Sequence, residues 1–404
     1  MNTYIKKLLK PANYIIYLLY TKFYIPYKVR KIRKKDFIRV VFILTEVGVW
    51  KTEKLYLKML NHPRFQPQLL VIPSLEDQYA YNEMKVFLDK KKYTYTTLNE
   101  NETIQKRLKP DIIFYQKPYS KVISRKYRYY YNLQSLFCFV NYGIHSVLEK
   151  HILNQPMLNF AWQVYYENTT CSKEASSLMN NGGHNCVVTG LPIMDELIEA
   201  SKISIKKDIV KQKKTIIWAP HHTIPIKKNW LNYSTFLDYA DFMIEVAQKY
   251  QDKIEFVFKP HPLLEPKLRK FWGEKKTQAY YEKWRNMPNT RVELGKYIDL
   301  FQESDAMIHD CSSFIIEYQY FNKPVMFLQN GEDHSYNMCS MAKEAYNLHI
   351  FGYNKEDIIN FIENNVLEGK DYLKSKREAF IKDNLFPPNG LSATDNIIRS
   401  ILGS

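Results

Sequence analysis

The sequence predicts an α/β protein built from two doubly wound parallel sheets that follow one another along the chain. Three observations predict this fold class. Short apolar runs are typical of buried strands, amphipathic stretches lie between them, and a basic, polar stretch separates a first set from a second. The 404 residues, 45% of them hydrophobic, suffice for two domains with their own cores.

The first set of strands begins after Asp36. Its apolar runs are 37–44, 68–73, 111–116, 136–141 and 186–190. The helix-like stretches between them include 52–61, 77–90 and 101–108. Because short buried strands that alternate with helices form parallel sheets, residues 37–200 are predicted to form an N-terminal Rossmann-like domain.

The second set follows a linker predicted at 201–214, "SKISIKKDIVKQKK". Its apolar runs are 214–219, 254–259, 306–309 and 324–328. A helix is predicted over 234–250, with Ser234 or Thr235 as its cap. Its apolar stripe consists of Phe236, Ala240, Met243, Ala247 and Tyr250. These patterns predict a C-terminal Rossmann-like domain at 215–385 and a C-terminal helix within 386–404.

The positive charge of the chain is concentrated in residues 1–35. The formal net charge is +16, from 58 Lys and Arg against 42 Asp and Glu, and such a balance favours an acidic partner. Residues 1–35 contain no acidic residue and ten basic ones: Lys6, Lys7, Lys10, Lys22, Lys28, Arg30, Lys31, Arg33, Lys34 and Lys35. Since the rest is only mildly basic, we expect no nucleic-acid partner.

Residues 1–36 are predicted to form a basic amphipathic segment that lies at a membrane interface. The longest uncharged run, 11–21, is shorter than the about 20 apolar residues that a spanning helix needs, and it lacks the cleavage site of a signal peptide. The side chains expected at or in the headgroup boundary are Tyr14, Ile15, Ile16, Tyr17, Leu18, Leu19, Tyr20, Phe23 and Tyr24. Lys and Arg can meet anionic lipid at about 1 kcal/mol each. The alternative is a solvated basic leader.

Cysteine usage and missing motifs limit the possible cofactors. The five Cys include no CxxC pair, which favours a reduced, cytosolic setting without a zinc site or a disulfide framework. The chain has no GxxxxGK[ST], GxGxxG, HExxH or Asp-x-Asp sequence. We therefore expect no cofactor, and no metal is required. With the basic segment, the protein is predicted to lie peripherally on the cytoplasmic face of the cell membrane.

Polar residues follow three predicted strands of the second domain. They are His221, His222, Thr223, Lys259, His261, Asp310, Ser312 and Ser313. Because the carboxyl ends of parallel strands meet at one edge of a sheet, we expect these side chains to share one site. Lysine, protonated histidine and a helix N-terminus can together neutralise a diphosphate without metal.

The stretch "HDCSSF", residues 309–314, admits two interpretations. A nucleophile elbow needs small residues beside the serine, and none is present; Cys311 with His309 as its base is the thiol alternative. The apolar pattern of "FIIEYQYF" instead predicts a helix that starts near Ser312. His309 then belongs to the strand, Cys311 is a filler, and the turn offers backbone N–H groups and hydroxyls to an anion.

Several spaced motifs resemble one known family. "FKPHP", "YIDLFQESDAMIHDCSSFIIEYQYFNKPVMFL", "VVTGLPIMDEL" and "IIWAPHHTI" are similar to the donor-site region of the CDP-glycerol:glycerophosphotransferases of teichoic-acid-type polymer synthesis, over roughly residues 186–330. The resemblance implies a GT-B fold, with two facing Rossmann-like domains for acceptor and nucleotide donor. It also implies membrane association and transfer of a polyol phosphate from a CDP-activated donor to a hydroxyl of a lipid-linked or growing polymer, with release of CMP.

The resemblance also assigns residue roles. It implies that His261, Asp310, Ser312 and Ser313 hold the donor phosphates, and that Glu317 holds the ribose hydroxyls. Two departures are that Cys311 stands where the family commonly has an aromatic residue, and that the family's His-Gly element is matched only by "VNYGIHSV".

We expect an in-line attack of the acceptor hydroxyl on the β-phosphorus, with catalytic roles for His145 and His261. His145 is the first choice as base, because it follows the strand 136–141, and His221 or His222 is the second. Two other functions stay open. One is a GT-B glycosyltransferase of capsule or surface polysaccharide synthesis that uses a nucleotide sugar, and the other is a non-catalytic membrane protein that binds an anionic polymer.

Overall fold

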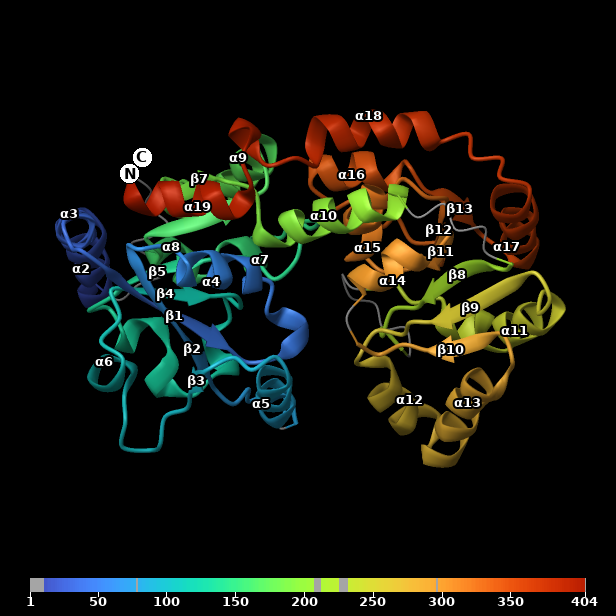
Figure 1. Cartoon of the computed structure of the whole chain (residues 1–404), viewed down its shortest axis with the longest axis horizontal. Helices are drawn as coiled ribbons and strands as arrows, with labels where there is room; N and C mark the ends of the chain where they lie inside the picture. The colour runs from blue at the N-terminus through green and yellow to red at the C-terminus, as the bar shows by residue number, and fades with distance from the viewer. Residues whose placement is uncertain (1–10, 78, 207–211, 225–231, 296, 404) are drawn as a thin grey trace. The chain divides into compact units, whose positions relative to one another are not determined.

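The structure, a computed structural model, describes residues 11–77, 79–206, 212–224, 232–295 and 297–403. It divides into two compact units. Unit 1 comprises Met1–Glu196 and Phe386–Ser404, and unit 2 comprises Leu197–Leu385. Each unit contains one parallel sheet with helices packed around it (Figure 1).

The sheet of unit 1 has seven strands among the residues described, in the order β3-β2-β1-β4-β5-β6-β7. All its strand pairs are parallel. The strands are β1 (Ile38–Leu44), β2 (Phe65–Val71), β3 (Tyr95–Thr96), β4 (Ile112–Tyr115), β5 (Leu136–Phe139), β6 (Gln163–Tyr166) and β7 (Cys186–Val188). The order reverses between β1 and β4, which is the switch point of a doubly wound sheet.

The helices of unit 1 surround this sheet. The α-helices are α2 (Pro11–Leu18), α3 (Ile25–Arg33), α4 (Glu53–Leu60), α5 (Ala80–Lys90), α6 (Ile104–Arg107), α7 (Lys150–Leu153), α8 (Pro156–Phe160), α9 (Thr169–Leu178) and α19 (Ala393–Leu402), with α10 (Pro192–Lys206) leading into unit 2. The other helical turns are η1 (Leu19–Tyr24), η2 (Val47–Val49), η3 (Ser120–Val122), η4 (Arg125–Tyr127), η5 (Tyr129–Tyr131) and η8 (Pro388–Gly390).

The sheet of unit 2 has six strands in the described part of the chain, in the order β10-β9-β8-β11-β12-β13. They are β8 (Lys214–Ala219), β9 (Ile254–Phe258), β10 (Thr290–Val292), β11 (Ala306–His309), β12 (Val325–Leu328) and β13 (Ile350–Gly352). All pairs are parallel, and the order reverses between β8 and β11. The prediction of two doubly wound parallel sheets is confirmed.

The helices of unit 2 are α11 (Phe236–Lys249), α12 (Leu264–Trp272), α13 (Glu274–Asn286), α14 (Ile298–Glu303), α15 (Phe314–Glu317), η6 (Tyr318–Phe321), α16 (Ser340–Tyr346), α17 (Lys355–Asn360), η7 (Phe361–Leu367) and α18 (Lys374–Asn384). The predicted apolar stripe of 234–250 is buried in α11, as its helical spacing requires.

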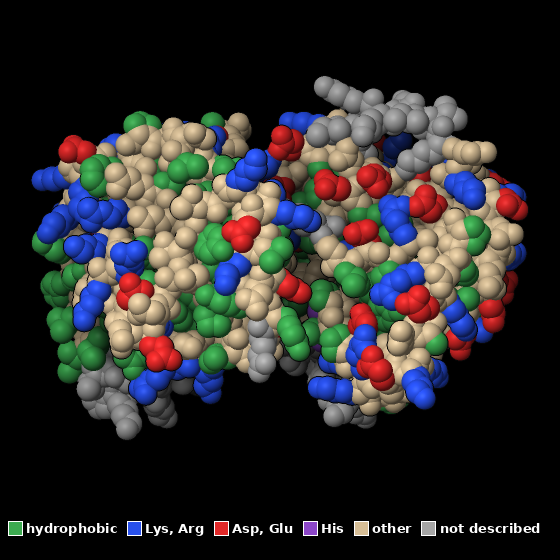
Figure 2. All heavy atoms as spheres, turned by 60° about the horizontal axis from the view of Figure 1, so that its bottom comes forward, with side chains coloured by type: hydrophobic (Ala, Val, Ile, Leu, Met, Phe, Trp, Pro, Cys, Tyr) green, Lys and Arg blue, Asp and Glu red, His purple; other side chains and the backbone are tan. Residues whose placement is uncertain are grey.

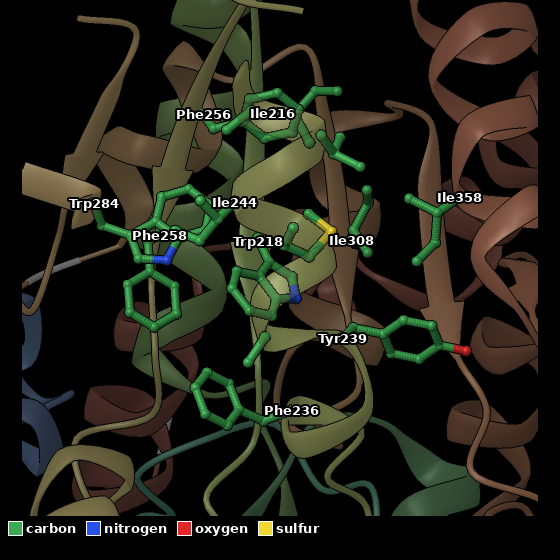
Figure 3. Packing of buried hydrophobic residues seen from close by; sticks show 14 of the residues in the cluster. Ile216, Trp218, Phe236, Tyr239, Ile244, Phe256, Phe258, Trp284, Ile308 and Ile358 are labelled. Atoms are coloured by element: carbon green, nitrogen blue, oxygen red, sulfur yellow. The ribbon is translucent and has the colours of Figure 1, made fainter. Parts of the chain in front are cut away.

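Large aromatic side chains fill the core of unit 2 beside β8 and β9 (Figure 3). The Trp218 ring stacks on Phe258 with centroids 5.1 Å apart and on Phe236 at 5.7 Å, and Trp284 stacks on Phe258 at 5.1 Å. Such rings bury large apolar areas in fixed orientations. The carboxyl ends of β8 and β9 are therefore held on a rigid support.

The predicted interfacial segment is helical in its described part. Tyr20 is buried and its hydroxyl donates to the carbonyl of Ser135 at 3.0 Å, while Tyr17 packs edge-on against Phe160. These two tyrosines contact unit 1, whereas the sequence placed them at a lipid boundary. Residues 1–10 lie outside the described residues. No helix in the described ranges is long and apolar enough to cross a membrane.

Other side chains of the same segment are exposed. The exposed apolar ones are Ile15, Ile16, Leu19, Phe23 and Tyr27, and we call them the apolar face of α2–α3. Figure 2 shows hydrophobic side chains together with Lys and Arg along the edge of unit 1 where Figure 1 places these helices. Lys35 fixes α3 to the body of unit 1 through an ion pair of 2.7 Å with the buried Asp111.

Two predicted boundaries differ from the structure. Residues 201–206 of the predicted linker continue helix α10, Lys214 already belongs to β8, and 207–211 lie outside the described residues. The segment 386–404 forms η8 and α19, and it belongs to unit 1 (Figure 1). Asp195 holds the start of α19 by accepting the backbone N–H groups of Ala393 and Thr394 at 2.7 and 2.9 Å.

Candidate functional site

Three neighbouring strands of unit 2, β9, β8 and β11, end in the polar segments singled out in the sequence. The backbone N–H of His261 donates to the carbonyl of Pro220 at 3.0 Å, which joins the segments after β9 and β8. The backbone N–H of His221 donates to Asp310 Oδ1 at 2.5 Å, which joins the segments after β8 and β11. The structure thus brings the three segments together beside the switch point, as expected.

The rings of His221, His222 and His261 form a compact group that we call the histidine cluster. The centroid of His222 lies 4.2 Å from each of the other two rings, which are 5.3 Å apart. One ring nitrogen of each residue lies within 4.8 Å of the corresponding atom of the others. Three ring nitrogens can therefore act on a single ligand.

Each Nδ1 atom of the histidine cluster faces a hydrogen-bond donor. The Nδ1 of His222 lies 2.8 Å from Lys267 Nζ, and that of His261 lies 3.1 Å from the backbone N–H of Leu263. A backbone N–H and an ammonium group can only donate. In a neutral ring whose Nδ1 accepts, the ring proton is on Nε2.

The same assignment holds for His221 by a count of lone pairs. Its Nδ1 lies 3.1 Å from the hydroxyl oxygen of Thr223. That oxygen already accepts the backbone N–H groups of Tyr233 and Ser234 at 3.1 and 3.0 Å. With both lone pairs used, the Thr223 hydroxyl must donate to the ring. All three rings thus carry their proton on Nε2.

Burial keeps these rings uncharged at neutral pH. It lowers the pKa of His221 well below the usual value, that of His222 to about 4 and that of His261 to about 3, and neighbouring positive groups add to the effect. This corrects the expectation of protonated histidines. The positive charge comes from lysines, namely the buried Lys259 and the partly exposed Lys267.

The spacing of the three ring nitrogens would also suit a metal ion. A metal ligand must present a lone pair, and metal-bound histidines usually donate their other N–H to an acceptor. The histidine cluster has the reverse arrangement, because each Nδ1 accepts and each Nε2 carries a proton. Three neighbouring N–H donors near the buried Lys259 are chemically complementary to an anion.

Asp310 is buried between the segments and has protein partners on both oxygens. Oδ1 accepts the backbone N–H of His221, and Oδ2 accepts the backbone N–H and the hydroxyl of Thr235 at 2.6 and 2.8 Å. Burial raises the pKa of Asp310 to about 6, against the effect of these hydrogen bonds. Asp310 thus ties the turn after β11 to the cluster and to the start of α11, while the sequence had placed it at the donor phosphates.

Cys311 and His309 are buried behind this turn. His309 Nδ1 lies 3.8 Å from Cys311 Sγ, so the two side chains share a face of the turn. Burial nevertheless raises the pKa of the Cys311 thiol and lowers that of His309 well below its usual value. A thiolate–imidazolium pair is disfavoured here, which supports the interpretation of Cys311 as a filler.

The remaining predicted residues of unit 2 surround the turn. Ser313 precedes the helix α15, which has only four residues and continues as the 3₁₀ turn η6. This single turn is shorter than the helix expected, so its dipole contributes less to anion binding. The side chain of Ser312 hydrogen-bonds the hydroxyl of Tyr233, and Glu317 is buried in α15.

His145 is the one predicted site residue of unit 1, and it follows β5. Its Nδ1 lies 2.8 and 3.0 Å from the two oxygens of Glu167, and its backbone N–H donates to Oε1 at 2.6 Å. The ring of Tyr166 stacks on the imidazole with centroids 4.9 Å apart. Here Nδ1 must donate, because a carboxylate can only accept.

Sequence reasoning missed several residues that form these sites: Glu167, Tyr233 and Lys267. Glu167 follows β6, a four-residue strand that no apolar run marked. Tyr233 precedes α11 and Lys267 lies within α12, so neither residue directly follows a strand. An acid one residue after a strand was the available signal for Glu167.

One known protein family matches the part of the chain that contains most of these residues. The model of the family described as CDP-glycerol:poly(glycerophosphate) glycerophosphotransferase matches residues 152–403, which is more than half of the chain. This range contains the histidine cluster, the turn at Asp310, and Glu167. No curated protein matches the chain.

Several solved structures share the fold at low sequence identity. The UDP-GlcNAc 2-epimerase of Neisseria meningitidis bound to UDP-GlcNAc has 14% identity and a TM-score of 0.59, with 91% of this chain and 100% of that chain covered. A histidine-to-asparagine variant of the wall teichoic acid polymerase TagF has 14% identity and a TM-score of 0.57, with 97% and 98% covered. The S. aureus MnaA–UDP structure has 14% identity, a TM-score of 0.56 and coverage of 90% and 96%. The fold is of the GT-B type.

Proposed function

Because the chain belongs to the CDP-glycerol:poly(glycerophosphate) glycerophosphotransferase family, and so is a glycerophosphotransferase enzyme, we propose the reaction that its two sites carry out. The enzyme transfers a polyol phosphate, most simply glycerol phosphate, from a CDP-activated donor to a hydroxyl of a lipid-linked or cell-surface, teichoic-acid-like glycan. CMP is the other product.

The observation that carries this proposal is the histidine cluster beside Lys259. Three neighbouring histidine rings, each with its proton on Nε2, and the buried Lys259 lie at the carboxyl edge of a doubly wound sheet, where such folds bind nucleotides. The donor has two linked phosphates with one negative charge each. Hydrogen bonds to charged groups contribute about 1.5–3 kcal/mol each, so the cluster supports diphosphate binding without charged histidines.

The chemical step is an in-line displacement at the β-phosphorus. The acceptor oxygen forms a bond to this phosphorus, and the bond between the phosphorus and the bridging oxygen breaks, so that CMP leaves. The acceptor hydroxyl loses its proton to a base, for which we propose His145. Donor groups fixed in advance stabilise the charge that develops on the transferring phosphoryl oxygens.

We propose that the reaction requires no metal. Lys259 and the Nε2–H groups supply the positive and donor groups that a divalent ion would supply in a metal-dependent transferase. Turnover should be the same after dialysis against EDTA and after addition of Mg²⁺. Loss of turnover with EDTA and its recovery with a divalent ion would overturn this part of the proposal.

We also propose that the apolar face of α2–α3 holds the protein peripherally on the cytoplasmic leaflet. Five exposed apolar side chains lie among basic ones on a segment whose other face is anchored in unit 1. Vesicles with 30% anionic lipid should sediment the protein, and neutral vesicles much less. Phe23→Glu should reduce sedimentation, while Tyr353→Glu, at an exposed aromatic of unit 2, is the matched control. Equal sedimentation of both variants would contradict the assignment.

A donor panel tests the reaction itself. The protein is incubated with CDP-glycerol, CDP-ribitol, CMP-sugar or UDP-GlcNAc and an acceptor, and nucleotide release is measured. We expect CMP release from a CDP-polyol only. UDP-GlcNAc is included because a neighbour of the same fold binds it, and release of UDP would favour a nucleotide-sugar glycosyltransferase. No release with any donor would contradict an enzymatic role.

A further inference from the structure

The buried carboxylate of Glu167 is bonded to His145 in two ways. Its oxygens lie 2.8 and 3.0 Å from the ring Nδ1, and Oε1 also accepts the backbone N–H of His145 at 2.6 Å. The side chain of Glu167 is 0% exposed and that of His145 is 12% exposed. The Glu167 carboxylate therefore fixes both the backbone and the imidazole ring of His145.

The surroundings of Glu167 leave it little freedom. It directly follows β6, and the next residue, Asn168, caps helix α9 by accepting the N–H of Cys171 at 2.9 Å. On its other side, the Tyr166 ring lies against the imidazole of His145 with planes 26° apart. A strand end, a helix cap and a stacked ring thus hold the carboxylate and the imidazole in one relative orientation.

We propose that Glu167 is the positioning residue of His145: it holds the ring proton on Nδ1, so that the Nε2 lone pair accepts the proton of the attacking hydroxyl. This inference rests on the proposed function, because it assigns a role within that reaction. The Glu167 carboxylate accepts the Nδ1–H and stabilises the imidazolium that forms, which is how a buried carboxylate assists a histidine base.

The proton can be followed through the step. The acceptor O–H bond breaks and its proton moves to Nε2 of His145, while the acceptor oxygen bonds to the β-phosphorus and CMP leaves. The imidazolium then carries protons on both nitrogens, with Nδ1–H still on Glu167. Release of the Nε2 proton to solvent or product restores the neutral ring and leaves the Glu167 carboxylate unchanged.

A purely structural role is the competing explanation, because Glu167 also binds the backbone of His145. Glu167→Gln separates the two roles. The amide oxygen, at the position of Oε1, can still accept both the backbone N–H and the Nδ1–H of His145, but the amide carries no charge. The loop keeps its backbone bond, while the imidazolium that forms on proton transfer loses its counter-charge, and the amide NH₂ at the position of Oε2 competes as a donor for Nδ1.

The test combines kinetics with a double-mutant cycle. We expect Glu167→Gln to lower kcat by about 10²- to 10⁴-fold with KM changed less than about threefold. Glu149→Gln removes a carboxylate beside another histidine, the exposed His151 at 3.5 Å, and should change kcat less than twofold. In a His145→Ala background, Glu167→Gln should have no further effect, because its action passes through the ring.

Nitrogen-15 spectra of labelled histidine give a readout that needs no substrate. In the wild type, His145 should show a protonated Nδ1 and an unprotonated Nε2, and Glu167→Ala, which removes the acceptor of the Nδ1–H, should shift the proton toward Nε2. An unchanged tautomer, an undiminished kcat, or an equal loss in the His145→Ala background would overturn the proposal. If the donor panel fails, the spectrum still decides whether Glu167 sets the tautomer, so the two failures are distinguishable.

Discussion

The histidine cluster of unit 2 and His145 of unit 1 use the same side chain in opposite ways. In the cluster, each Nδ1 faces a donor, so Nε2 carries the proton. At His145, Nδ1 faces the carboxylate of Glu167, so Nε2 carries the lone pair. The first arrangement presents hydrogen-bond donors to a ligand, and the second presents a base.

This difference teaches that the partner of Nδ1, more than the presence of histidine, determines what a site can do. A lysine, a backbone N–H and a hydroxyl convert three histidines into neutral donors, which suits an anionic diphosphate. A buried carboxylate converts a fourth into a proton acceptor, which suits a hydroxyl nucleophile. In the proposed reaction, unit 2 supplies the hydrogen-bond donors and unit 1 supplies the base that phosphoryl transfer to an alcohol needs.

A third arrangement, the buried pair His309 and His349, shows the same logic in a structural setting. His349 Nδ1 lies 2.9 Å from the carbonyl of Ala345 and must donate, so its Nε2 accepts from His309 Nε2 at 3.1 Å. His309 Nδ1 lies 3.1 Å from the backbone carbonyl oxygen of Cys311 and 3.3 Å from its backbone N–H, so its partners include both an acceptor and a donor. This chain of bonds supports the turn that carries Asp310.

The largest expected effect is the loss of the base. His145→Gln should lower kcat by about 10²- to 10⁴-fold, because proton transfer from the hydroxyl is lost, while the affinity for the donor is unchanged because unit 2 is intact. Steady-state kinetics and donor titration measure the two quantities. The control is His151→Gln, which replaces an exposed histidine of unit 1. A comparable loss of donor affinity would contradict the assignment of donor binding to unit 2 and of proton transfer to unit 1.

The second effect is the loss of one donor from the histidine cluster. His261→Ala should weaken transition-state stabilisation by about 10²- to 10³-fold and weaken donor binding as well. His184→Ala, at an exposed position of unit 1, is the matched control. Donor binding measured by calorimetry should fall only in the first variant. Unchanged binding in His261→Ala would show that the cluster does not hold the donor.

The third effect concerns stability. Asp310→Ala leaves the buried N–H groups of His221 and Thr235 without their acceptor, and each loss costs about 1–3 kcal/mol. We expect the urea midpoint of unit 2 to fall, together with activity. Asp252→Ala, at an exposed acid of the same unit, is the control. An unchanged midpoint with lost activity would instead favour direct contact of Asp310 with the donor.

The smallest effect concerns pH. The pKa values of His222 and His261 lie at about 4 and 3, below the usual 6.5, so the rings stay neutral above about pH 5. Donor affinity should therefore change less than about threefold between pH 6 and 8, and it should rise only as the rings become charged below pH 5. Imidazolium ligands of ordinary pKa would weaken binding about tenfold per unit above pH 6.5. A fall of that size by pH 8 would contradict neutral donors.

The sequence was informative where a pattern has a fixed physical cause. Buried apolar runs marked nine of the thirteen strands described here, and the polar residues after β8, β9 and β11 converge because parallel strands end at one edge. The missed strands β3, β6, β10 and β13 have the sequences "YT", "QVYY", "TRV" and "IFG", none of which stands out as an apolar run. Because β6 was not predicted, Glu167, which directly follows it, was not recognised as a site residue.

The sequence could not show which side chains contact one another. That Lys267 meets His222, or that Thr235 meets Asp310, depends on packing between segments 45 and 75 residues apart. The charge of the histidines was predicted wrongly for the same reason, because burial sets it. The sequence also could not show that the side chains of His309 and Cys311 share a face of the turn, or that burial disfavours a reactive thiolate–imidazolium pair there.

The most direct test of this account is to measure which ring nitrogen of each histidine is protonated in the wild-type protein at pH 7.5. Selective nitrogen-15 labelling, with assignment by single substitutions, reports which ring nitrogen carries the proton. We predict a protonated Nε2 at His221, His222 and His261 and a protonated Nδ1 at His145. The same tautomer at all four residues, or imidazolium in the cluster, would contradict the account.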